Sequence, residues 1–152
     1  MSIRALLGSI LLIFLSFNVG CSKKGTEGMD AKAVLTEYIS VSFAAKVPED
    51  RKRLLTYLTG ETKVRMQNWS DEQFMQAFVD TRRNFVKLAF KEFKKVHENE
   101  ASLTYDLIYD VPNARITQRK LAQMVKPQGA WLIQDVKNIK EVVEYKNELA
   151  FP

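Results

Sequence analysis

The sequence predicts an α+β domain, in which helices from the first half pack on one face of an antiparallel sheet of about four strands from the second half. Two observations lead to this prediction. Between residues 31 and 78, apolar residues recur at spacings of three and four, the period of an amphipathic helix. From residue 101 onward, apolar and polar residues alternate between short turns, as in a meander. Because helices precede strands, we expect the helices to cover a single face of the sheet.

A first helix is predicted to begin at residue 31, with Asp30 as its N-cap. The residues that recur at helical spacing are Ala31, Val34, Leu35, Tyr38, Ile39 and Ser42. A second helix is predicted from Pro48, which suits the first helical position, to Gly60, which suits the position just past the C-cap. Its buried stripe would consist of Leu54, Leu55 and Leu58.

A third helix is predicted to begin after Ser70 and to continue through Phe78. Gln73 stands three residues after Ser70, the spacing of a capping box. Trp69 and Phe74 occupy the two positions of a hydrophobic staple. We therefore interpret Trp69 as a structural residue and not as a ligand-stacking one.

Four strands follow in the prediction. Residues 84–97 favour a long strand, although a helix stays open because Lys, Glu and Phe mix in both periods. Residues 101–111 alternate clearly, and strands are also predicted over residues 115–126 and 131–139. Pro112-Asn113 and the segment 127–129 mark turns, and residues 146–152 are expected to form a tail.

Residues 1–20 predict an export signal. Arg4 precedes a nearly continuous apolar run over residues 5–17, and this run is short for a membrane span. The segment Asn18-Val19-Gly20-Cys21 resembles the lipobox of bacterial lipoprotein precursors, although that family usually has an aliphatic residue where Asn18 stands. The resemblance implies cleavage after Gly20 and lipidation of Cys21. An uncleaved anchor, or an ordinary secretory signal with an incidental cysteine, is the alternative.

The same resemblance implies an address in the cell. Acyl chains on Cys21 would hold the protein on a membrane, and more than one chain makes such anchoring stable. Ser22 resembles the class sorted to the outer membrane, so we expect the domain to face the periplasm. The polar, glycine-containing segment 21–30 is expected to be a lipidated flexible tether for a globular domain over residues 31–145.

The order of elements is similar to the cystatin-like fold of the nuclear transport factor 2-like superfamily. The matching parts are AKAVLTEYISVSF, RKRLLTYLTG, LTYDLIYDV and GAWLIQDVKNI. The resemblance implies that the sheet is curved around a helix, with a cone-shaped pocket as one outcome. Some members of the superfamily are enzymes, and many only bind or assemble.

Composition excludes several classes of function. One cysteine allows no internal disulfide, and one histidine with one cysteine falls short of a structural zinc site. The net charge of +5 is too modest for a nucleic-acid partner. No Gly-rich phosphate loop is present, and we expect no metal or cofactor. His97 lies among charged residues and favours a solvated side chain over a general base.

The favoured hypothesis is a non-enzymatic binding or interaction domain for an envelope protein, an envelope polymer or a small apolar ligand. Tyr105, Tyr109 and Trp131 could line an aromatic pocket, although packing in the core is the favoured interpretation. The alternative hypothesis is a small-pocket enzyme that uses Asp80 or Asp106 as a buried acid with a raised pKa. Asp106 and Asp110 cannot form a glycosidase pair, because four strand residues separate them by about 13 Å.

Overall fold

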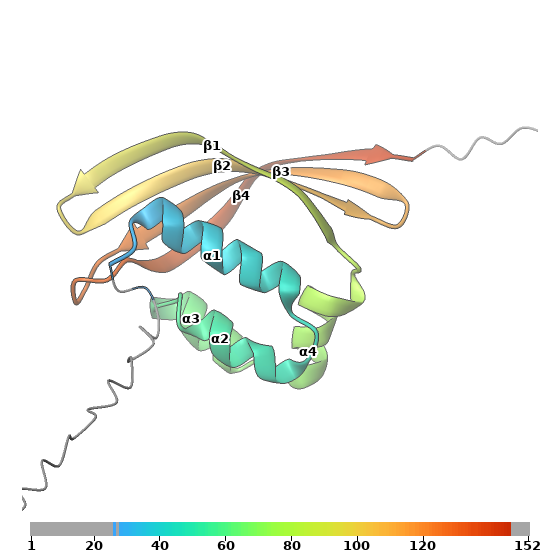
Figure 1. Ribbon diagram of the computed structural model, residues 1–152, viewed down its shortest axis with the longest axis horizontal. Coiled ribbons are helices and arrows are strands. Elements are labelled where there is room, and N and C mark those ends of the chain that lie inside the picture. Colours follow the sequence, from blue (N-terminus) through green and yellow to red (C-terminus); the bar gives the residue numbers. More distant parts are fainter. Residues whose placement is uncertain (1–25, 27, 147–152) are drawn as a thin grey trace, which may run out of the picture.

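Four α-helices precede four β-strands in the computed structural model, which describes residue 26 and residues 28–146 (Figure 1). The helices are α1 (Ala31–Ala44), α2 (Arg51–Leu55), α3 (Gly60–Gln67) and α4 (Asp71–Met75). A 3₁₀ turn (Pro48–Asp50) leads into α2, and a π-helical turn (Gln76–Asp80) continues α4. The strands are β1 (Asn84–His97), β2 (Glu100–Val111), β3 (Ala114–Val125) and β4 (Leu132–Tyr145).

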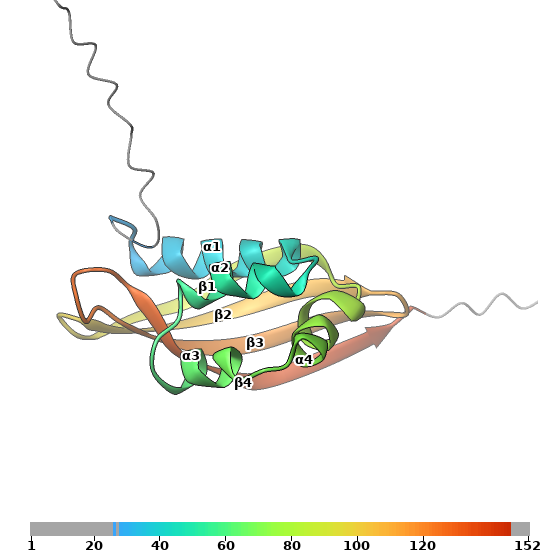
Figure 2. The ribbon, with the colours of Figure 1, turned by 90° about the horizontal axis from the view of Figure 1, so that it is seen from below.

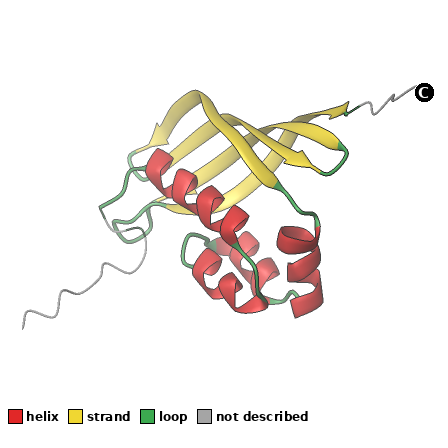
Figure 3. Cartoon of the chain, turned by 45° about the vertical axis from the view of Figure 1, so that its right-hand side comes forward, coloured by secondary structure: helices red, strands yellow, loops and turns green. Residues whose placement is uncertain are grey.

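The strands form one antiparallel meander in the order β1-β2-β3-β4. Register shifts interrupt the β1–β2 and β3–β4 ladders, and such irregularities bend strands and increase their twist. Figure 1 shows the resulting curved sheet arching over α1, and Figure 3 shows all the helices on one side of it. The predicted α+β class, with helices on one face of a curved four-stranded antiparallel sheet, is confirmed.

Helix α1 lies along the concave face of the sheet, next to β1 (Figure 2). Asp30 caps it as predicted, since its Oδ1 accepts a hydrogen bond from the Ala33 amide at 2.7 Å. The predicted stripe is buried or partly buried, with Val34 and Leu35 fully inaccessible to solvent. Replacing Asp30 by Ala would remove this acceptor and leave the Ala33 amide at the start of α1 without its partner.

The predicted helix from Pro48 to Gly60 is wrong in its second half. Helix α2 ends at Leu55, and Leu58 instead forms a parallel bridge with Ile133 of β4. The Ile133 amide donates to the Tyr57 carbonyl at 2.8 Å, and the Thr59 amide donates to the Ile133 carbonyl at 3.0 Å, so these two groups pair with the sheet and do not continue the helix. Gly60 has a φ of +61° and begins α3, where a side chain would strain the backbone.

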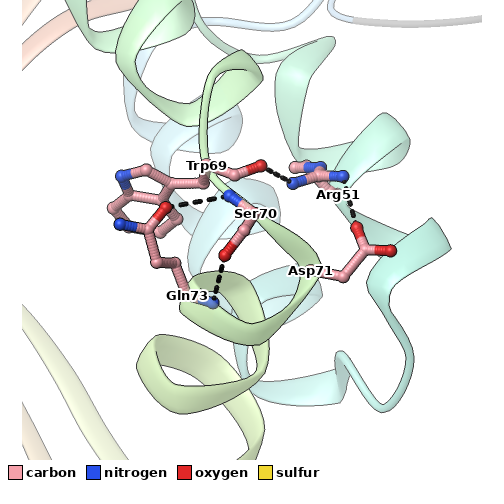
Figure 4. A network of polar contacts seen from close by, with 5 residues as sticks. All are labelled: Arg51, Trp69, Ser70, Asp71 and Gln73. Carbon is pink, nitrogen blue, oxygen red and sulfur yellow. Dashed lines mark hydrogen bonds and ion pairs between the residues drawn. The ribbon is translucent and has the colours of Figure 1, made fainter.

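Helix α4 begins as predicted. The Gln73 amide donates to Ser70 Oγ at 3.1 Å, and the Ser70 amide donates to Gln73 Oε1 at 2.8 Å (Figure 4). Arg51 ties this helix start to α2, because its guanidinium donates to the Trp69 carbonyl and to Asp71 Oδ1. The helix continues into the π-helical turn, where the Phe78 ring lies 6.1 Å from the Trp69 ring.

The strand predictions hold except at the end of β4. Residues 84–97 form a strand and not a helix, and the bounds of β2 and β3 agree to within one residue. The predicted strand over residues 131–139 is too short, because pairing with β3 continues to Tyr145. Charged residues in the last part of β4 obscure its apolar–polar alternation, although this part of β4 pairs with β3 as far as Ala114↔Tyr145.

A single core lies between the helices and the concave face. Its largest side chains with almost no exposed surface come from helices, from the α2–α3 connection and from β2 to β4: Phe74, Leu35, Leu54, Leu58, Leu103, Met124, Ile133 and Val34. The convex face carries no helix among the described residues, and the ion pairs Asp106–Arg119 and Asp110–Arg115 lie on it. No helix in residues 28–146 is long and apolar enough to cross a membrane.

Candidate functional site

Two of the three predicted pocket residues lie together on the concave face of β2. Tyr105 is 2% exposed and Tyr109 is 9% exposed, and both belong to the core. Trp131 is partly buried next to the start of β4, which pairs with the far end of β3. It therefore lies at the other end of the strands from Tyr109, and the three side chains do not meet at one place. The ammonium of Lys126 lies 5.8 Å from the Trp131 ring.

The concave face also receives an arginine that the sequence did not single out. Arg83 lies just before β1, and its guanidinium carbon stands 4.8 Å from the Phe43 ring centre, 5.3 Å from Phe78 and 6.0 Å from Tyr109. These rings belong to α1, the π-helical turn and β2. Contact with aromatic faces stabilises a guanidinium that has lost water, so the rings hold Arg83 at the boundary of the core.

Arg83 lacks the partner that a buried charge usually has. Its Nε is buried and makes no hydrogen bond among the described residues, and its Nη2 reaches the Ser42 carbonyl only at 3.5 Å. No carboxylate in residues 28–146 lies within ion-pair distance of it. Burial lowers the pKa of Arg83. A charge held in this way costs stability, since desolvation is not offset by pairing.

Lys120 is the second cation on the concave face. It pairs across the ladder with Tyr105, and directly opposite residues project from the same face of a sheet. Burial lowers the pKa of Lys120, and the nearby charge of Arg83 lowers it further. Glu141 acts in the opposite direction on Lys120, although its carboxylate accepts a hydrogen bond from Gln118 Nε2 and forms no ion pair among the described residues.

We call Arg83, Tyr109, Ile116, Gln118, Lys120 and Glu141 the concave site. The ladders place its strand residues side by side, because Ile116 pairs with Tyr109 and Gln118 pairs with Glu141. The site holds two cationic side chains and one carboxylate. Its arrangement therefore leaves one positive charge unneutralised at the edge of an aromatic core.

Backbone strain precedes the site. Arg82 has a φ of +47°, in the left-handed region that non-glycine residues rarely adopt. Such a conformation costs of order 1–3 kcal/mol and persists where the surroundings enforce it. Here it turns the chain from the π-helical turn into β1 and delivers Arg83 to the concave face. Strain and an unpaired charge thus coincide within two residues.

The carboxylates considered for catalysis have other surroundings. Asp106 lies on the convex face, where Arg119 Nε donates to it at 2.8 Å and Lys91 Nζ lies at 3.4 Å. The hydrogen bond from Arg119 holds the pKa of Asp106 below its usual range. A general acid needs the opposite shift. Asp80 is exposed, and so is His97 at the end of β1.

Asp110 belongs to the same convex face as Asp106. The Arg115 guanidinium donates to both of its carboxylate oxygens, at 2.9 and 3.2 Å, and lowers the pKa of Asp110. These two aspartates therefore work as ion-pair partners across neighbouring strands. No group of three or more His, Cys, Asp or Glu side chains in the described range could hold a metal ion.

Two hollows flank the core, and the first borders the concave site through Phe43, whose ring contacts Arg83. A hollow of about 310 Å³ lies between α1 and β1, with mostly apolar walls that include Ile39, Phe43 and Phe85. A polar hollow of about 720 Å³ lies between the start of α3 and β3–β4, and both Arg65 and Asp135 line it. The polar hollow mixes charges of both signs and so favours no class of ligand.

The lipidation and cleavage residues Gly20 and Cys21 lie outside the described residues, and so does the tail from residue 147. Their roles stay predictions. Within the described residues, the members of the concave site that the sequence analysis missed are Arg83, Ile116, Gln118, Lys120 and Glu141. The alternation of β3 could have placed Lys120 on the inner face, because it stands two and four residues from Ala122 and Met124, which are buried. No sequence pattern could have placed Arg83, because it stands outside any periodic segment.

Replacing Lys120 by Met is expected to stabilise the protein at pH 7 by about 1 kcal/mol, because an apolar side chain of similar size removes an unpaired, partly buried charge. Urea unfolding of the variant and of the wild type measures the difference. It should shrink as pH rises toward the ordinary lysine pKa of about 10.4, because the wild-type amine then becomes neutral in the folded state first. Lys94→Met on the exposed part of β1 is the matched control and should change stability little. Equal stabilisation by both substitutions would contradict the assignment.

Comparisons with known proteins give the fold and no more. No protein-family model matches the chain, and no curated protein matches it significantly. A SEC-C motif containing protein from Rhodopseudomonas palustris has a similar solved structure, with a TM-score of 0.54, 11% identity, and coverage of 72% of this chain and 79% of that one. The Ntf2-like, potential transfer protein TraM of the Gram-positive conjugative plasmid pIP501 covers 75% of this chain and 92% of its own at 10% identity, with a TM-score of 0.46 that is too low to carry an argument. The chain therefore shares an α+β fold with the first of these proteins, and its function has to be argued from its own residues.

Proposed function

We propose that the protein is a lipid-anchored domain of the bacterial cell envelope that binds a ligand on the concave face of its sheet and catalyses no reaction. The observation that supports binding is the pair of partly buried cations, Arg83 and Lys120, which have no ion-pair partner among the described residues. Keeping such charges costs stability. Partly buried charges that lower the stability of the free protein are often found at sites that bind a ligand.

The proposed address rests on the sequence. An apolar run over residues 5–17 precedes Gly20-Cys21, and Cys21 is the only cysteine of the chain. A polar tether between the anchor and α1 would let the domain stand off the membrane. An outer-membrane position facing the periplasm is part of the same proposal, and it would give the concave face access to envelope proteins and to small molecules of that compartment.

The enzyme alternative has no comparable support. It requires a buried carboxylate with a raised pKa, whereas an ion pair lowers the pKa of Asp106 and Asp80 is exposed. Glu141 is the carboxylate of the concave site, and it too is exposed. We therefore do not assign catalysis to any of these residues.

The anchor is tested by the intact mass of the membrane-extracted protein. The wild type is expected to begin at Cys21 and to carry acyl mass, whereas Cys21→Ser is expected to keep residues 1–20 and to lack that mass. A wild type that keeps residues 1–20, or begins elsewhere without lipid, would remove the proposed address. It would leave the concave site to be tested on its own.

Binding is tested by thermal unfolding in the presence of fractionated envelope extract. A ligand that binds only the folded state raises the midpoint of unfolding in a concentration-dependent way. We expect a small-molecule or protein fraction to do so for the wild type and to do so less for Lys120→Met. If no fraction shifts the midpoint, a structural role without a ligand replaces the proposal.

A further inference from the structure

We infer that the concave site recognises the carboxylate of a small amphipathic molecule, an assignment that rests on the ligand-binding function proposed above. The ligand would place its carboxylate against Arg83, on the face of the sheet from which Lys120 also projects. Its apolar part would lie against the neighbouring side chains of β3 and β4. The charges, the hydrogen-bonding groups and the apolar surface of the site each support this inference.

The charges call for a single negative group. Arg83 and Lys120 bring two positive charges, and Glu141 brings one negative charge that is engaged with Gln118. One positive charge is left over among these residues. A monoanion would neutralise it, whereas a phosphate with about two charges would leave an excess of negative charge in a partly desolvated place. The balance therefore favours a carboxylate.

The geometry of Arg83 suits a carboxylate as well. Its Nε is buried without a partner, and its Nη2 makes only a long contact with the Ser42 carbonyl. A guanidinium binds a planar carboxylate through two parallel hydrogen bonds, and such charge-assisted pairs are about twice as strong as neutral ones. The three aromatic rings around Arg83 hold the guanidinium in place, so little side-chain entropy is lost on binding.

The surface beside the cations is apolar. Ile116 of β3 pairs with Tyr109 on one side and with Val143 of β4 on the other, which puts the three side chains in a row across the concave face. Val143 is 38% exposed, and Ile116 is only partly buried. In Figure 1, the right-hand ends of β3 and β4 extend beyond the described helices. An apolar body that follows the carboxylate would cover this row.

Calorimetric titration of the full chain, extracted from membranes and held in bilayer discs, tests the assignment with defined probes. Hexanoate has a carboxylate on a short apolar body, and hexanamide is its neutral isostere. Empty discs are the blank, and inorganic phosphate is the third probe. We expect hexanoate to bind at least about tenfold more tightly than hexanamide, because only the anion forms charge-assisted hydrogen bonds.

Two substitutions with opposite expected effects on affinity separate binding from folding, because misfolding can only weaken binding. Lys120→Met should weaken hexanoate binding about tenfold, whereas Glu141→Gln should tighten it several-fold because a competing carboxylate is removed and the hydrogen bond to Gln118 can persist. Lys94→Met is the control for a lost lysine and should leave the affinity unchanged. Arg83→Met is less informative alone, because Arg83 also packs against three rings.

Three results would overturn the assignment. Equal affinity for hexanoate and hexanamide would show that binding is apolar only, and the ligand-binding function would survive without the carboxylate. Tighter binding of phosphate than of hexanoate would replace the carboxylate by a dianion. No binding of any probe would reject the inferred ligand class, and the unfolding experiment with envelope extract then decides whether the site binds anything at all.

Discussion

Phe74→Ala is expected to lower the free energy of unfolding by about 3–5 kcal/mol, the usual cost of removing a fully buried phenylalanine ring. Phe74 has no exposed surface and is the largest of the fully buried side chains. Its ring lies 5.0 Å from the Phe78 ring, and the Arg51 guanidinium lies 5.9 Å from its centre. Because α4 is only five residues long, its position depends on this packing.

Urea unfolding followed by circular dichroism gives the magnitude. Phe74→Leu should cost much less than Phe74→Ala, because it retains most of the buried volume. Phe93→Ala is the control for the same chemical change at a site that is 46% exposed, and it should cost about 1 kcal/mol. A loss for Phe74→Ala as small as the loss for Phe93→Ala would mean that α4 is not anchored to the core through this ring.

The amphipathic periods predicted most of the fold. In β2, the buried series Leu103, Tyr105, Leu107 and Tyr109 follows the two-residue alternation of the sequence without exception. The α4 start followed from local capping chemistry at Ser70, which is readable because donor and acceptor stand three residues apart. Segments whose structure depends on near neighbours were therefore predictable.

The errors occur where distant backbone decides the structure. Residues 57–59 read as the end of a helix, but the Tyr57 carbonyl and the Thr59 amide pair with Ile133, more than seventy residues further along the chain. The last residues of β4 form a strand because β3 supplies a ladder as far as Tyr145, although their own alternation is obscured by charged residues. Local propensity loses to tertiary pairing at both places.

The concave site could not be predicted from the sequence for a related reason. Its two cations stand 37 positions apart in the sequence, and only the register of the sheet and the turn at Arg82 bring them to one face. The tyrosines Tyr105 and Tyr109 were identified as candidates, yet the partner that gives them a functional context, Arg83, lies outside every periodic segment. A site of this kind is assembled by topology and not by a motif.

Tyr38 of α1 and the tyrosines Tyr105 and Tyr109 of β2 make the protein sensitive to alkali. Burial raises the pKa of Tyr38 to about 12, and it also raises the pKa of Tyr105 and of Tyr109. The ordinary value is about 10, so the unfolded chain releases the Tyr38 proton first. The resulting contribution to stability is complete below about pH 10 and is lost as pH rises toward the folded pKa. We therefore expect the free energy of unfolding to fall steeply between about pH 10 and 12.

Tyr38→Phe isolates one part of this loss. At pH 7 the variant should differ little from the wild type, because the hydroxyl is neutral in both states. Near pH 11.5 it should be more stable than the wild type by about 2 kcal/mol, since a phenyl ring has no proton to lose. Tyr145→Phe, at a side chain that is 74% exposed, is the control and should follow the wild type at every pH. If the Tyr38→Phe curve also follows the wild type to high pH, the Tyr38 hydroxyl ionises in the folded protein without penalty, and the surroundings of Tyr38 on α1 are then more open to water than the structure shows.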